Sequence, residues 1–131
     1  MKQNFKQKIE KSFGHRLIAN NYTKRIIIET ILLLPDDLIN FVTKNCWFIS
    51  SFEDGWAFVL KGDEIKRNEY LIFLSDELIK EGEEQMRYTI LHEIGHVILG
   101  HRNSIGEVQS KAEVKKQEKE ADEFVKNILS G

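Results

Sequence analysis

The hydrophobic positions of this chain follow different periods in its first, middle and last parts. Near the start, Phe5, Ile9 and Phe13 recur every four residues among lysines, which predicts a short amphipathic helix. Residues 24–33 are too densely apolar to show a period, and their length favours a helix over a strand. The proline at position 35 suits the first turn of a further helix.

The middle of the chain contains three short runs rich in aromatic and β-branched residues, as strands are. These runs are residues 46–50, 56–60 and 69–74, and residues 53–55 and 61–63 between them carry turn signals. Three strands joined by short turns predict a small antiparallel meander. Because helices precede and follow it, the predicted fold class is α+β.

Two helices are predicted in the last third of the chain. Residues 90–99 are apolar nearly all round a helix, which indicates a buried one. The final helix is expected from about residue 108 to residue 129, and lysines and glutamates alternate along its polar face, so a solvated face is favoured over a basic patch. The apolar stripe of this last helix consists of Ala121, Phe124, Val125, Ile128 and Leu129.

The buried helix carries the motif His92-Glu93-Ile94-Gly95-His96. In a helix, His92 and His96 lie one turn apart on the same face, so their imidazoles can bind one metal ion. Glu93 lies about 100° round the helix from His92, where it can reach a metal-bound water without being a ligand. Zinc accepts such ligands and keeps a position for water in catalytic sites. The alternative, a core helix with hydrogen-bonded histidines and no metal, is the less favoured one.

A third protein ligand has to come from elsewhere, and carboxylates of the last helix are the obvious source. On a helical wheel, Glu118 falls within the apolar stripe, Glu120 and Asp122 lie at its two edges, and Glu123 points away. Geometry alone therefore leaves Glu118, Glu120 and Asp122 open.

Two further polar residues flank the motif. His101 is expected to be a poor ligand, because it would lie about 180° from His92 on a continued helix. Tyr88 lies one turn before His92 and is expected to pack, with a contact to the metal cavity as the lesser alternative.

Composition narrows the class of protein. The chain has 131 residues, of which 41% are hydrophobic and 31% are charged, as in a soluble globular domain. We expect an N-terminal helical arm, 1–22, and a single domain, 23–131. A net charge of −2 provides no general basic field for nucleic acid. A single cysteine, Cys46, and no apolar run of membrane-spanning length or secretory type suggest a cytoplasmic protein.

The two motifs together resemble the ImmA/IrrE family of metallopeptidases. The likeness rests on His-Glu-Ile-Gly-His and on the later run Glu120-Ala121-Asp122-Glu123-Phe124. It implies a zincin-like fold, with helices packed around the motif helix. It also implies one zinc ion held by His92, His96 and Glu120, with Glu93 as general base. One departure is Val125, where the family usually has alanine.

The resemblance implies zinc-dependent hydrolysis of a peptide bond in a protein substrate. Members of that family often act on helix-turn-helix repressors of mobile-element or stress-response circuits. The alternative is a zinc-stabilised regulatory module that binds a repressor or toxin partner with little or no hydrolysis. We expect no direct binding to nucleic acid or membrane in either case.

Overall fold

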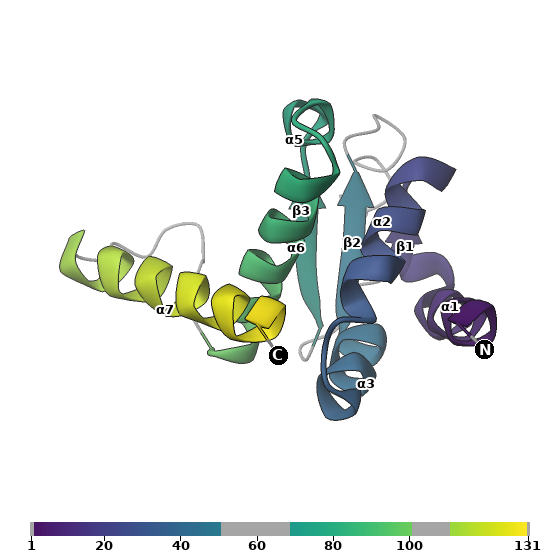
Figure 1. The fold of residues 1–131 in the computed structure, drawn as a ribbon, viewed down its shortest axis with the longest axis horizontal. Helices are drawn as coiled ribbons and strands as arrows, with labels where there is room; N and C mark the ends of the chain where they lie inside the picture. The colour runs from purple at the N-terminus through teal and green to yellow at the C-terminus, as the bar shows by residue number, and fades with distance from the viewer. Residues whose placement is uncertain (1, 51–68, 101–110, 131) are drawn as a thin grey trace.

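The computed structural model describes residues 2–50, 69–100 and 111–130. Helices dominate these residues, and a small sheet lies among them (Figure 1). In chain order the elements are α1 (Lys2–Phe13), a short 3-10 helix η1 (Gly14–Arg16), β1 (Leu17–Ile18), α2 (Asn21–Ile31), α3 (Asp36–Asn45), β2 (Cys46–Ser50), β3 (Tyr70–Leu74), α5 (Asp76–Lys80), α6 (Glu83–Ile98) and α7 (Lys111–Ser130).

The described sheet is parallel, in the order β1-β2-β3. The prediction of an antiparallel meander is therefore wrong. It assumed that short turns join neighbouring strands as hairpins, whereas the chain leaves β1 and returns to β2 through α2 and α3, the kind of crossover that parallel pairing requires. The strand predicted at 56–60 lies outside the described residues.

The central position of β2 explains its composition. All five of its residues are buried, as expected for a strand covered on both faces and flanked by two others. On β3, Ile72 and Leu74 are buried while Tyr70, Leu71 and Phe73 are exposed, so this strand buries one face only. Cys46, the first residue of β2, is fully buried.

The predicted N-terminal helix is confirmed, and it packs onto the domain. Ile9 and Phe13 are buried, and the Phe13 ring meets Phe48 of β2 edge-on at 5.6 Å between centroids. The guanidinium of Arg16 donates to the backbone carbonyls of Ser12 and Thr43, which ties the end of α1 to the end of α3. The boundary between an arm and a domain at residue 22 stays a prediction.

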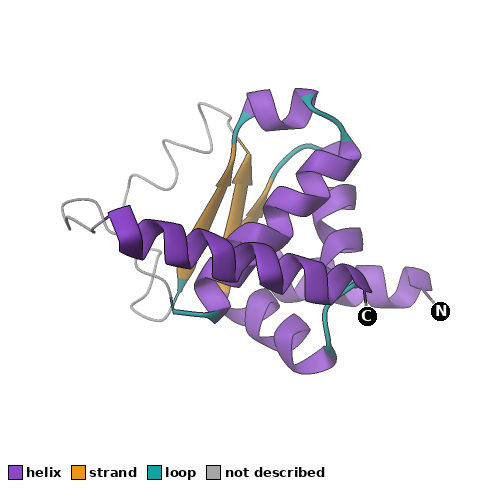
Figure 2. Cartoon of the chain, turned by 60° about the vertical axis from the view of Figure 1, so that its left-hand side comes forward, coloured by secondary structure: helices purple, strands orange, loops and turns teal. Residues whose placement is uncertain are grey.

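The motif helix α6 lies between α7 and the rest of the domain (Figures 1 and 2). It contacts α2 and β3 on one side and α7 on the other. The apolar side chains of α2 and α6 that are completely buried form the centre of the core; they are Ile26, Ile27, Ile31, Met86, Ile90, Leu91 and Ile94. None of the described helices is long and apolar enough to cross a membrane.

Candidate metal centre

The two histidines of the motif lie on the face of α6 that meets α7. They are one helical turn apart, and their ring centroids are 4.7 Å from each other with the planes nearly perpendicular. Only 13% of the His92 side chain and 11% of the His96 side chain are exposed. The helix thus presents two nearly buried imidazoles side by side.

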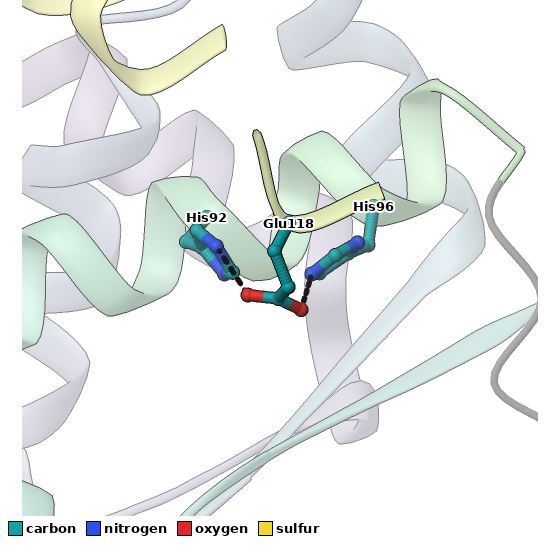
Figure 3. A group of neighbouring side chains, drawn as sticks. All are labelled: His92, His96 and Glu118. Carbon is teal, nitrogen blue, oxygen red and sulfur yellow. Dashed lines mark ion pairs between the residues drawn. The ribbon is translucent and has the colours of Figure 1, made fainter. Parts of the chain in front are cut away.

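The carboxylate of Glu118, on α7, bridges these imidazoles (Figure 3). Its Oε2 lies 3.2 Å from His92 Nε2, and its Oε1 lies 3.1 Å from His96 Nε2. The possible ligand atoms of the three residues all lie within 4.8 Å of one another. The Glu118 side chain is 54% exposed, so the carboxylate residue of this group is much more accessible to solvent than the two histidines.

This donor set fits a zinc ion. Zinc binds imidazole nitrogen and carboxylate oxygen at about 2.0–2.2 Å, so neighbouring ligands on a tetrahedral ion are about 3.3 Å apart. Each imidazole Nε2 lies close to that spacing from an oxygen of Glu118, His92 at 3.2 Å from Oε2 and His96 at 3.1 Å from Oε1. Two histidines and one glutamate also leave one position of a tetrahedral ion for water, as catalytic zinc sites do. The group of His92, His96 and Glu118 can therefore hold a metal ion.

The other residues considered from the sequence occupy different places. Glu93 is partly buried on α6, next to His92. Glu120, the ligand implied by the resemblance, is partly buried on α7 and is not one of the three converging side chains. Glu118 was one of the alternatives that the helical wheel left open, and the identity of the third ligand stays a prediction. His101 lies outside the described residues.

Tyr88 and Asp122 form a second link between α6 and α7 beside the histidines. The Tyr88 hydroxyl donates to Asp122 Oδ1, and the same oxygen lies 3.3 Å from His92 Nε2. The Tyr88 ring stacks on the His92 ring at 5.8 Å. The hydrogen bond to Asp122, together with burial and the nearby carboxylates, raises the pKa of Tyr88 to about 12, so the phenol keeps its proton at neutral pH.

The expectation that Tyr88 packs agrees with the contact of its ring, but it did not include the hydrogen bond of its hydroxyl. The signal for the ring contact was in the sequence, since residues four apart on a helix face each other. The partner of the hydroxyl came from α7, and no local pattern pairs Tyr88 with Asp122.

Gly95, between the two histidines, allows α7 to come close. A Cβ atom added at Gly95 would lie 2.9 Å from Phe124 Cδ1 and 3.3 Å from Phe124 Cβ. Such distances are too short for ordinary contact, so any larger residue would force the Phe124 ring or the helix to move. The small residue therefore sets how near Glu118 and Asp122 lie to the imidazoles.

Comparison with known proteins gives a match to a family of peptidases. Residues 84–130 match the model of the family Peptidase U49. This segment is less than half of the chain, but it contains α7 and all of α6 except its first residue, and thus every side chain of the candidate centre. The match supports a peptidase without pointing specifically to the ImmA/IrrE family. No curated protein and no solved structure matches the chain.

Proposed function

We propose that this protein is a zinc-dependent metallopeptidase that cleaves a peptide bond in a protein substrate. One observation carries the proposal: the carboxylate of Glu118 lies 3.1–3.2 Å from both imidazoles of a His-Glu-x-x-His helix. This group lies inside the segment that matches a peptidase family. Geometry favours Glu118 over Glu120 as third ligand, because the Glu118 oxygens already reach both rings.

His92, His96 and Glu118 would hold the ion, with both imidazoles in the neutral form that binds metals. A zinc ion bound there supplies Lewis acidity and makes a water nucleophilic near neutral pH. Both rings are largely buried, and both direct Nε2 at the carboxylate of Glu118.

Glu93 is the proposed general base. The water oxygen attacks the carbonyl carbon while the Glu93 carboxylate takes the water proton. As the C–N bond breaks, Glu93 returns that proton to the leaving amine nitrogen. Two points support this role: Glu93 follows His92 on α6, about 100° further round the helix, and it is not one of the three residues whose possible ligand atoms converge.

The substrate class follows from the resemblance described above. We propose a cytoplasmic protein substrate, with a helix-turn-helix repressor as the first candidate. The Glu118 side chain is 54% exposed, so this proposed ligand is in contact with solvent.

A regulatory binding module with structural zinc is the second candidate, and the docking of α7 favours it. Of the described residues of α7, only Ala121 and Val125 are buried. A helix with so little buried apolar surface gains stability from an ion that ties it to α6. In that case the metal would hold a binding surface together, and hydrolysis would be absent.

The test compares wild type with Glu93→Gln on a fluorogenic peptide library and on casein, with zinc content measured on the same samples. We expect wild type to cleave and Glu93→Gln to lose about 100-fold or more of the rate, because a general base contributes that much. Its zinc content should remain at the wild-type level. Glu123→Gln, on the exposed part of α7, is the matched control.

Each possible result contradicts a different part of the proposal. Equal rates for wild type and Glu93→Gln would remove Glu93 from the mechanism. Zinc binding without cleavage of either substrate or of a candidate repressor would favour the binding module. Absence of zinc from the wild-type protein, even after incubation with the ion, would reject both candidates.

A further inference from the structure

Two carboxylates face a single nitrogen at the candidate centre. Glu118 Oε2 lies 3.2 Å from His92 Nε2, and Asp122 Oδ1 lies 3.3 Å from the same atom. When this nitrogen carries a proton it can donate that proton to only one of the two carboxylates, and when it carries a lone pair it can donate to neither. When a metal takes the lone pair, His92 Nε2 has no proton to give to Asp122.

The Tyr88 hydroxyl is then the remaining described donor to Asp122 Oδ1. The tyrosine is well placed to restrain this oxygen, because its ring stacks on His92 one helical turn away. Asp122 is accordingly near His92 but outside the group of three whose ligand atoms lie within 4.8 Å of one another. The hydrogen bond thus holds a carboxylate at the margin of the proposed metal site.

The position of this carboxylate decides what kind of site the chain makes. Three protein ligands leave a position for water, whereas four close a zinc site and make it structural. The 3.3 Å between Asp122 Oδ1 and His92 Nε2 is about the spacing of neighbouring ligands on one tetrahedral ion. A movement of Asp122 toward His96 and Glu118 would therefore supply a fourth ligand.

We propose that Tyr88 is a positioning residue that keeps Asp122 out of the coordination sphere and so keeps one coordination position open. The hydroxyl occupies a lone pair of Oδ1 and fixes the carboxylate against α6. This role rests on the proposed function, because it needs an ion at His92, His96 and Glu118.

The alternative role for Tyr88 predicts the opposite sign. If Tyr88 and Asp122 only orient the His92 ring, removing the hydroxyl weakens metal binding, by about 10- to 100-fold for an outer partner of a ligand. If the hydroxyl restrains Asp122, its removal frees the carboxylate to bind, so metal binding becomes tighter while the open position is lost.

The experiment uses the full chain loaded with Co²⁺, whose visible absorption reports ligands. Tyr88→Phe keeps the stacked ring and removes only the hydroxyl. We expect its dissociation constant for Co²⁺ to fall by about tenfold, the scale on which outer partners act. Acetohydroxamate, a small chelating ligand that needs an open position, should bind at least about tenfold more weakly, by the same scale.

Two further variants complete the design. Tyr88→Phe combined with Asp122→Asn should return the dissociation constants for Co²⁺ and for acetohydroxamate toward wild type, since the amide is a poorer metal ligand than the carboxylate. Tyr22→Phe is the matched control, because Tyr22 is exposed on α2 and stacks with Arg25 away from the site. It should change neither constant.

Unchanged or weaker Co²⁺ binding by Tyr88→Phe would overturn the restraining role while leaving the metal centre in place. The same holds if acetohydroxamate binds this variant as well as it binds wild type. If the His96→Ala variant binds Co²⁺ as tightly as wild type does, the proposed centre itself would be overturned, and the role of Tyr88 with it.

Discussion

The two faces of α6 are held in the domain by different forces. The face toward α2 and the sheet carries four completely buried apolar side chains, Met86, Ile90, Leu91 and Ile94. Burial of apolar surface is non-directional, so this face tolerates small shifts. The face toward α7 carries His92, His96 and Tyr88, whose contacts with Glu118 and Asp122 depend on direction and on tenths of an ångström.

The two faces of α6 thus have different roles: one face stabilises the fold, and the other carries the groups proposed to bind the metal. The apolar face anchors α6 whether or not an ion is bound. The polar face gains its full set of interactions only when a proton or a metal ion is shared between the imidazoles and the carboxylates, because a largely buried imidazole is costly without a partner. Variants on the two faces should therefore respond differently to metal.

The largest effect is expected on the apolar face. Ile90→Ala removes a completely buried side chain from the centre of the core and leaves a cavity. We expect the free energy of unfolding to fall by about 2–5 kcal/mol, as measured by urea denaturation with and without zinc. The loss should be the same in both conditions. A loss that disappears when zinc is added would break the division between the faces.

Glu118→Ala, on the helix that meets the polar face of α6, should weaken the binding of zinc. Removal of a direct ligand should cost more than the roughly 100-fold that loss of an outer partner costs, or more than about 2.7 kcal/mol of binding free energy. Zinc affinity measured by competition with a chelator checks this, and the unfolding curve of the metal-free protein should stay near wild type because the side chain is half exposed.

Glu120→Ala and Glu123→Ala are the matched variants on the same helix, and both should keep zinc. If Glu120→Ala loses the ion while Glu118→Ala keeps it, the ligand implied by the resemblance is right and the proposed one is wrong.

The smallest of the three effects is expected at Gly95, where the faces of α6 and α7 meet. Gly95→Ala adds a Cβ that would lie 2.9 Å from the Phe124 ring and pushes α7 outward. We expect about tenfold weaker zinc binding, comparable to a disturbed outer contact. The free energy of unfolding should change little. Alanine favours a helix over glycine by about 0.5–1 kcal/mol, and this gain offsets the cost of the contact with Phe124.

A second substitution sharpens this test. Phe124→Leu in the Gly95→Ala background makes room for the new methyl group and should recover part of the lost affinity. Zinc affinity that is unchanged by Gly95→Ala alone would show that the close approach of the two helices does not set the geometry of the site.

Much of the local structure could be predicted because it depends on neighbours in sequence. The four-residue steps of Phe5, Ile9 and Phe13 lie in α1, and the apolar runs at 46–50 and 69–74 contain β2 and β3. The direction of strand pairing could not be predicted in this way, because it depends on how the helices between β1 and β2 return the chain to the sheet.

In the candidate site, too, the features that depend on neighbours in sequence could be predicted, and those that depend on the docking of another helix could not. The placement of His92 and His96 side by side follows from helical geometry, and both residues are on α6. The carboxylate that meets them depends on how α7 is rotated and how closely it docks, and at Gly95 a Cβ would lie 2.9 Å from the Phe124 ring. A helical wheel of α7 alone leaves Glu118, Glu120 and Asp122 open because it contains no information about the partner helix.

The burial of Cys46 has a consequence for which metals this chain can attract. Desolvation in the core raises the pKa of this thiol to about 12, so the thiolate does not form at physiological pH. The chain contains no other cysteine. A thiophilic ion such as Cu⁺ therefore finds no sulfur anion to bind, and the selection among ions is left to nitrogen and oxygen donors, which suit zinc and its harder neighbours.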